Sequence, residues 1–221
     1  MAPRANGNEA ISEMTTGRLS VYLRCLTYLE SANKLTVSSA ELADRFHLNS
    51  AQIRKDLACF GEFGTRGVGY NVAQLKDALI HELGLDRTRK ILIVGAGNLG
   101  MALSDYRGFN ERGFHIVAMV DVDPEKVGRS SRSGIPILPY EQLPEIVRRN
   151  DVEIGILAVA AESAQETYDA LVDAGVRAIL NFAPAQMRYQ RGVKVRSVDL
   201  RINLESLSFY LKNVEDGTAV E

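Results

Sequence analysis

The segment at residues 90–100 constrains the fold of this chain more than any other part of the sequence. It reads KILIVGAGNLG, a mostly apolar run that leads directly into a G-x-G-x-x-G pattern. The run predicts a buried strand, and the residues that follow have helical spacing. In such a strand–turn–helix, Gly95 allows the tight turn, Gly97 lets a pyrophosphate approach the backbone, and Gly100 lets the helix pack closely. The segment therefore predicts a dinucleotide site, with contacts from Gly95, Ala96, Gly97, Asn98, Leu99 and Gly100 and with the phosphates at the helix N-terminus.

An acidic residue ends the next predicted strand, FHIVAMVD at residues 114–121. Asp121 follows Gly100 at about the distance where an acid accepts hydrogen bonds from the adenosine ribose hydroxyls. A 2′-phosphate there would bring two negative charges close together. Asp121 therefore predicts NAD or NADH rather than NADP. A glycine-rich turn that binds nothing is the alternative.

Strand and helix patterns alternate from residue 90 onward. Continuous apolar strands separated by helices of similar length indicate a parallel sheet covered on both faces. We therefore expect a doubly wound, Rossmann-like α/β domain over residues 86–200. Residues 201–221 follow it, and helical spacing returns between Leu204 and Leu211.

The first part of the chain has a different organisation. Residues 1–15 are polar and without periodicity, which predicts a mobile tail. Over residues 16–85 we expect a winged helix-turn-helix domain. Its first helix runs from about Leu19 to Asn33, and capping signals at Ser38 or Ser39 and at Asn49 or Ser50 start two more.

The two capped helices fit a helix-turn-helix, because the small Ala43 lets them cross closely. His47 occupies a turn position where glycine is common. After the second helix comes FGEFGTRGVGYNV, whose glycines favour a two-stranded hairpin, the wing. A three-helix protein-interaction domain is the alternative interpretation.

The second helix of the motif is the candidate to enter the major groove of DNA. Its N-terminal and exposed residues would meet bases and phosphates: Ser50, Ala51, Gln52, Arg54 and Lys55. Asp56 is assigned to the same outer faces of this helix. Arg66, at the tip of the predicted hairpin, would reach an adjacent minor groove. The net charge of the chain is −2, so a basic face must be local.

Composition narrows the setting and the chemistry. No apolar run reaches the length of a membrane span and the first 20 residues lack an apolar core, so we expect a cytoplasmic protein with Cys25 and Cys59 reduced. None of the eight tyrosines precedes a lysine by four residues, and none of the three histidines is placed as a hydride-site acid. A small NAD-dependent oxidoreductase and a CoA-binding domain remain the alternatives to a regulator.

Taken together, five segments of the chain resemble the Rex family of bacterial redox-sensing transcriptional repressors. They span roughly residues 18 to 212 and read SSAELADRFHLNSAQIRKDLACFGEFGTRGVGYNV, ILIVGAGNLGMAL, DVDPEKVG, ILNFAPA and VDLRINLESLSFYL. The resemblance implies a homodimer, not an enzyme, that binds a pseudopalindromic operator when NAD+ prevails and leaves it when NADH rises. NAD+ and NADH are then effectors. It also implies that a C-terminal helix, about residues 203–213, is exchanged between the two subunits.

The same resemblance implies a switch made of three residues, Arg18, Tyr106 and Asp199. Asp199 would pair with Tyr106 in one state and with Arg18 in the other, and Tyr106 would also contact the cofactor. We expect an apolar lining from residues 182–184 to favour the neutral nicotinamide of NADH over the cationic ring of NAD+.

Overall fold

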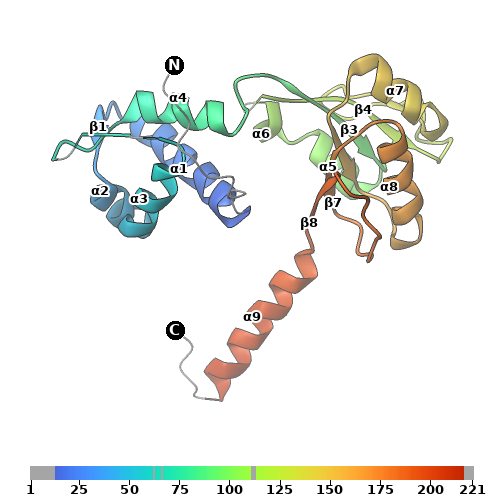
Figure 1. Cartoon of the computed structure of the whole chain (residues 1–221). Helices are drawn as coiled ribbons and strands as arrows, with labels where there is room; N and C mark the ends of the chain where they lie inside the picture. The colour runs from blue at the N-terminus through green and yellow to red at the C-terminus, as the bar shows by residue number, and fades with distance from the viewer. Residues whose placement is uncertain (1–12, 62, 66, 111–112, 217–221) are drawn as a thin grey trace. The chain divides into compact units, whose positions relative to one another are not determined.

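The computed structural model describes residues 13–61, 63–65, 67–110 and 113–216, which belong to two compact units, Met1–Arg87 and Thr88–Glu221 (Figure 1). Both were expected from the sequence, one as a DNA-binding fold and one as a Rossmann-like fold. No helix among the described residues combines the length and apolar character needed to cross a membrane.

The N-terminal unit is a group of helices around one apolar core. Its elements are α1 (Glu13–Ser31), β1 (Thr36–Val37), α2 (Ser39–Phe46), α3 (Ser50–Ala58), β2 (Tyr70–Asn71) and α4 (Val72–Glu82). Leu26, Leu29, Ile53 and Leu79 are completely buried in this core. Because α1, α3 and α4 all contribute, loss of any one of them would expose the others.

Side-chain caps start the two helices of the helix-turn-helix. The side chain of Ser38 accepts a hydrogen bond from the amide of Glu41 at 3.0 Å, and that of Asn49 accepts one from the amide of Gln52 at 2.9 Å. Each cap satisfies an amide that has no partner within its helix. Between the helices His47 takes a left-handed conformation with φ 53°, which is why glycine is common at this turn.

One expected boundary in this unit was wrong. α1 begins at Glu13, so residues 13–15 belong to the helix and not to a tail; residues 1–12 lie outside the described part of the chain. In the glycine-rich segment, of which residues 62 and 66 lie outside the described part of the chain, an antiparallel bridge joins Thr65 to Gly69, as in the expected hairpin. The strand after this segment, β2, pairs with β1, which precedes the helix-turn-helix, and that pairing was not predicted.

The C-terminal unit is built on a six-stranded parallel sheet with the strand order β5-β4-β3-β6-β7-β8. The strands are β3 (Arg89–Val94), β4 (Phe114–Asp121), β5 (Ile137–Pro139), β6 (Ile154–Leu157), β7 (Ala178–Asn181) and β8 (Lys194–Ser197). The helical segments are α5 (Asn98–Ser104), α6 (Arg107–Asn110), η1 (Tyr140–Gln142), α7 (Leu143–Asn150), η2 (Ala161–Ser163) and α8 (Ala164–Asp173).

Alternate residues of the central strand β3 belong to separate apolar clusters. Leu92 and Val94 pack in a cluster that includes residues of α7 and α8, whereas Ile91 and Ile93 pack in one that includes residues of α5 and α6. Side chains alternate across a strand, so this division means that helices cover both faces of the sheet. The expected doubly wound architecture is confirmed.

The last helix of this unit, α9 (Leu200–Glu215), follows β8, and none of its residues is buried (Figure 1). It carries an apolar row at spacings of three and four residues. The members of this row, 54–66% exposed, are Leu200, Leu204, Leu207, Leu211 and Val214. Such a row on a helix normally packs against another surface.

Candidate functional site

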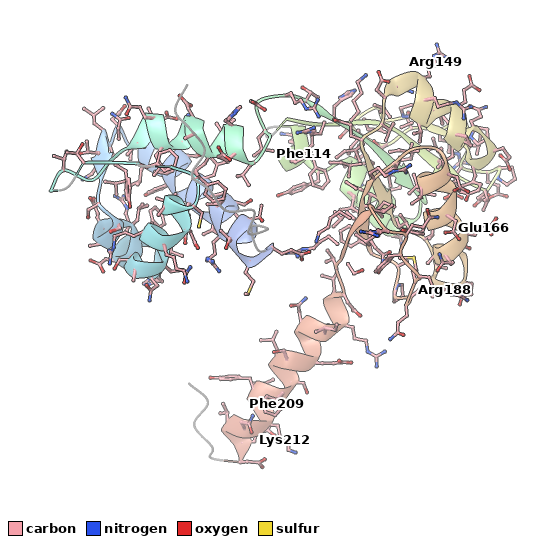
Figure 2. The ribbon with its side chains drawn as sticks, viewed as in Figure 1. Phe114, Arg149, Glu166, Arg188, Phe209 and Lys212 are labelled. Carbon is pink, nitrogen blue, oxygen red and sulfur yellow. The ribbon has the colours of Figure 1, made fainter. Side chains whose placement is uncertain are left out.

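A cavity of about 380 Å³ opens at the carboxyl ends of β3, β4 and β6. The chain leaves β3 towards β4 on one side and returns through β6 on the other, so the strand order reverses here. Ligands of open parallel sheets bind at this type of crevice. Val94, Val120 and Ala158 are among the lining residues, as is Glu166. Figure 2 labels Glu166 on α8.

The three glycines of the turn after β3 have different surroundings. Gly95 has φ +97°, and a Cβ atom there would lie 2.4 Å from the carbonyl oxygen of Ala158; a Cβ atom on Gly100 would lie 1.8 Å from that of Gly95. The fold itself therefore requires these two glycines. A Cβ atom on Gly97 would meet no atom within 4 Å, so the space beside its backbone is open to a ligand.

The helix that follows the turn begins with exposed residues. α5 starts at Asn98, no side chain caps it, and both Asn98 and Leu99 are exposed. The backbone amides of its first turn are thus not taken by a capping side chain. This geometry is compatible with the expected phosphate contacts, which stay a prediction.

Asp121, at the end of β4, is nearly buried and holds the glycine-rich turn. Its Oδ2 accepts a hydrogen bond from the amide of Ala96 at 2.7 Å, and its Oδ1 accepts one from the amide of Asp123 at 2.9 Å. Lys126 Nζ lies 3.4 Å from Oδ2. Burial acts to raise the pKa of Asp121, but the two amides and Lys126 outweigh it and hold this pKa below its usual value. Contact with a ribose stays a prediction; the structure adds a role in shaping the turn.

Several lining residues of this cavity were not predicted, among them Lys126 and Tyr140. Lys126 lines it and pairs with Asp121. Tyr140 also lines it, and its buried hydroxyl has no hydrogen-bond partner among the described residues. Lys126 follows Asp121 by five residues, and this short interval could have indicated that the two side chains pair. Nothing in the sequence indicated that Tyr140 would line the cavity.

The other residues expected near the cofactor lie elsewhere in the same unit. Tyr106 is 59% exposed, lies between α5 and α6, and makes an edge contact with Phe109 at a ring distance of 5.0 Å. It is not among the residues that line the cavity. Asp199 caps α9 by accepting a hydrogen bond from the amide of Arg201 at 2.9 Å. No hydrogen bond joins Tyr106 to Asp199 within the described ranges.

The segment expected to line the nicotinamide is held by a buried side chain at the end of β7. Asn181 donates to the carbonyl of Ala183 at 3.1 Å and accepts from the amide of the same residue at 2.9 Å. Ala183 is itself 5% exposed. The segment is therefore anchored to the sheet.

On the helix-turn-helix, the candidate DNA contacts lie at different depths. Ala51, Arg54 and Lys55 are exposed on α3, whereas Ser50 and Gln52 are half-buried. Arg66 lies outside the described residues.

Arg54 also takes part in a second cavity, of about 350 Å³, between the helix-turn-helix and the glycine-rich segment. Its Nη1 donates to Ser39 Oγ at 2.9 Å. This bond ties the guanidinium of the exposed Arg54 to the start of α2, and contact of Arg54 with DNA stays a prediction.

Asp56 is not on an exposed face of α3, as the sequence had indicated; it is 2% exposed. Arg18 donates to it twice, from Nε to Oδ2 at 2.6 Å and from Nη2 to Oδ1 at 2.7 Å. Tyr22 Oη donates to Oδ2 at 2.8 Å, and Gln52 Nε2 donates to Oδ1 at 2.7 Å. The expectation failed because the helix periodicity does not show that Arg18 provides a partner for a buried carboxylate.

This network shifts the pKa of each ionisable member. The hydrogen bond to Asp56 is the main cause that raises the pKa of Arg18. Burial, followed by the bond to Asp56, raises the pKa of Tyr22. Burial works against ionisation of Asp56, but the bonds from Arg18, Tyr22 and Gln52 outweigh it and lower the pKa of Asp56. The carboxylate is therefore ionised and paired at neutral pH.

Comparison with protein families gives two matches. Residues 86–185 match the family described as "CoA binding domain", and residues 10–58 match the one described as "Putative DNA-binding protein N-terminus". The two matches fall largely on the two structural units.

Curated relatives cover nearly the whole chain. A "Redox-sensing transcriptional repressor Rex" of Carboxydothermus hydrogenoformans is 53% identical over 91% of this chain and 97% of its own length. One of Desulfitobacterium hafniense is 48% identical over 90% of this chain and 94% of its own length. These relatives, unlike the CoA-binding family, extend across both units.

Solved structures give the same result. The chain resembles RSP, a Rex-family repressor, in complex with β-NAD+ and operator DNA, with a TM-score of 0.89, 36% identity and coverage of 95% of each chain. It resembles RSP in complex with β-NADH with a TM-score of 0.83 and 35% identity, over 95% of this chain and 97% of that one.

Proposed function

Because the chain belongs to the Rex family of redox-sensing transcriptional repressors, we propose that it binds operator DNA through α3 and leaves it when NADH occupies the cavity of the C-terminal unit. The observation that carries this proposal is the similarity over 95% of the chain to a repressor seen both with NAD+ and operator DNA and with NADH. The two surfaces that such a protein needs, a nucleotide cavity and an exposed basic helix, are present in separate units.

The residues of the cavity suit a dinucleotide. The open space at Gly97 would take the pyrophosphate, and Asp121 and Lys126 would lie near the adenosine ribose. We place the nicotinamide near the apolar segment at residues 182–184. When bound, the dinucleotide supplies a signal of redox state, because its ring is cationic in NAD+ and neutral in NADH. An apolar lining disfavours burial of the cation, so this segment would bind NADH more tightly.

In this proposal NADH and NAD+ are effectors and not redox substrates, which rests on the relatives' being repressors. NADH can release DNA only by its difference in affinity between the DNA-binding and the free conformation. Operator DNA must then weaken NADH binding by the same factor. Since the operator is on the chromosome, we place the protein in the cytoplasm.

We propose that the working unit is a homodimer and that α9 is exchanged between its subunits. The support is the exposed apolar row of α9, together with Phe209, which is 64% exposed on the opposite side of the same helix (Figure 2). A monomer would leave this surface in water. A two-fold dimer would also present two copies of α3 to the half-sites of a pseudopalindrome.

The residue-level roles in DNA binding are proposals of the same kind. Exposed Arg54 and Lys55 would contact phosphates or base edges, with Ser50, Ala51 and Gln52 beside them and Arg66 in the adjacent minor groove. For the switch, we propose that Asp199 pairs with Tyr106 in one state and with Arg18 in the other. The contacts of Tyr106 and Asp199 in this structure leave each of them available for a new partner.

The test is binding of the full-length protein to promoter fragments of its own genome at fixed salt, alone and with saturating NAD+, NADH or NADPH. We expect sequence-selective binding that NADH releases and NAD+ does not. The variant Arg54→Ala/Lys55→Ala serves as a DNA-binding control, because it should lose DNA but keep NADH. Retention of no fragment under any condition, with NADH still bound, would contradict the proposal.

A further inference from the structure

The carboxylate of Asp56 joins α1 to α3, the helix we propose to enter DNA. Two of its three partners, Arg18 and Tyr22, lie on α1. The third, Gln52, lies on α3 like Asp56 itself. All four bonds are between 2.6 and 2.8 Å. A change in the angle between α1 and α3 would therefore break several short bonds together.

The hydrogen-bonding capacity of this carboxylate is filled. A carboxylate accepts about four hydrogen bonds, two at each oxygen. Oδ2 has Arg18 Nε and Tyr22 Oη, and Oδ1 has Arg18 Nη2 and Gln52 Nε2. Because the group is buried and charged, loss of the arginine would leave an anion that only neutral donors compensate, which is strongly unfavourable.

The arginine, by contrast, has donors to spare. It holds Asp56 with Nε and Nη2, and Nη2 also donates to Thr15 Oγ1 at 3.2 Å. Nη1 donates to no acceptor within the described ranges. The side chain of Arg18 is 34% exposed, against 3% for that of Asp56. The fork is thus fixed on its inner edge and has an unused N–H group on a side chain that solvent can reach.

We infer that Asp56 is a positioning residue of the switch: it fixes the guanidinium of Arg18 for a second carboxylate and passes the gain or loss of that partner to α3. This rests on the proposed function, in which Asp199 supplies the second carboxylate. Once Asp56 holds the fork, a second acid meets a pre-oriented donor and does not have to order a flexible side chain. Any displacement of the Arg18 guanidinium also displaces Asp56, and it therefore changes the orientation of α3.

Fold stability alone gives little reason for this arrangement. A buried ion pair often contributes no more to stability than well-packed apolar residues of similar volume. An apolar residue at position 56 would join α1 to α3 without a charge to satisfy. What the carboxylate adds is a fixed direction for Arg18.

The test compares full-length wild type with Asp56→Asn, which keeps the shape but removes the charge, and with Arg18→Lys, which keeps the charge but removes the fork. The matched control is Asp77→Asn, an exposed acid on α4. For each protein we would measure the operator Kd with saturating NAD+ and with saturating NADH, the NADH Kd without DNA, and thermal unfolding. The decisive quantity is the operator Kd with NADH divided by the operator Kd with NAD+. A purely structural role of Asp56 would not change this ratio.

We expect Asp56→Asn and Arg18→Lys each to lower this ratio on the order of fivefold or more, the range of ordinary allosteric coupling. NADH binding without DNA and the control should be unaffected, and the double variant should be no worse than either single one. If both variants weaken operator binding by equal factors with NAD+ and NADH, the inference is wrong. If Asp56→Asn does not fold, Arg18→Lys decides alone: a wild-type ratio in that variant would also show that the inference is wrong.

The outcome also separates this inference from the proposed function. If wild type itself binds the operator equally with NAD+ and NADH, the proposed function fails and the inference with it. If wild type responds and both variants respond equally well, only the role of Asp56 is excluded.

Discussion

Asp121 accepts a hydrogen bond from the backbone amide of Ala96 at 2.7 Å and thereby joins the end of β4 to the turn that follows β3. The acid is 9% exposed, and its other oxygen is taken by the amide of Asp123. Its carboxylate thus shapes the turn before any ligand arrives. A single residue connects the two strand ends between which the nucleotide would lie.

The variant Asp121→Asn should therefore weaken NADH binding. An asparagine has one acceptor oxygen and one NH2 group, so one of the two backbone amides loses its partner. An unsatisfied buried amide costs about 1–3 kcal/mol. If the turn changes its conformation to give this amide a new partner, NADH must restore the original turn on binding, and its affinity falls on the order of tenfold. Fluorescence titration with NADH measures the change. Asp151→Asn, at an exposed acid that ends α7, is the matched control, and equal affinity in both variants would exclude the role of Asp121.

Gly97 and Gly100 should respond differently to the same added methyl group. In Gly97→Ala the Cβ atom meets nothing within 4 Å, so the melting temperature should equal that of wild type. The affinity for NADH should fall, because the methyl group would occupy the space proposed for the phosphates. In Gly100→Ala the Cβ atom falls 1.8 Å from the carbonyl oxygen of Gly95, so the fold itself should lose about 1–3 kcal/mol of stability. Thermal unfolding and NADH titration on both variants separate the two effects. Unchanged NADH binding in Gly97→Ala would show that the pyrophosphate lies elsewhere.

The sequence predicted well wherever a local pattern decides the structure. The apolar run before Gly95 gave β3, the caps at Ser38 and Asn49 gave the starts of α2 and α3, and His47 took the left-handed turn. The resemblance to the Rex family is confirmed by the relatives. In each case the signal lies within a few residues of the feature it determines.

What failed depends on partners far along the chain. Burial of Asp56 requires Arg18, 38 residues away, and the pairing of β2 requires β1 on the other side of the helix-turn-helix. β8 was missed because it is an edge strand, Lys194–Ser197, with charged and mostly exposed residues. No periodicity marks such a strand, since only its pairing with β7 defines it.

Acid should destabilise the N-terminal unit through Asp56. Its pKa is lowered in the folded chain, so it contributes stability that is present above its unfolded pKa of about 3.9 and is lost as the pH falls through the lowered folded value. The free energy of unfolding of wild type should therefore decline below about pH 5, and in Asp56→Asn this decline should be shallower. Urea unfolding between neutral and acid pH measures both slopes. The same slope in Asp56→Asn and wild type would mean that this carboxylate is not paired in solution.

A charge in the apolar row of α9 should abolish the dimer. Leu207 is 60% exposed in the single chain, so Leu207→Asp costs little in an isolated subunit but places a carboxylate in the proposed interface. We expect a monomer by sedimentation, with a normal far-ultraviolet spectrum and weakened operator binding. Lys212→Asp, also on α9 but outside the row, provides the control. A Leu207→Asp protein that remains dimeric would place the interface elsewhere.

Tyr140→Phe should move stability and ligand affinity in opposite directions. The hydroxyl of Tyr140 is buried without a hydrogen-bond partner within the described ranges, so its removal should stabilise the ligand-free protein by about 1 kcal/mol. The same hydroxyl lines the cavity, and a bound nucleotide that provides its missing partner would lose that bond, so NADH affinity should fall. Tyr168→Phe is the matched control, because the hydroxyl of Tyr168 accepts a hydrogen bond from the amide of Gln190 at 2.7 Å and its removal should destabilise the protein. Calorimetric unfolding with and without NADH gives both quantities; a Tyr140→Phe variant that gains stability and keeps full affinity would show that the nucleotide does not use this hydroxyl.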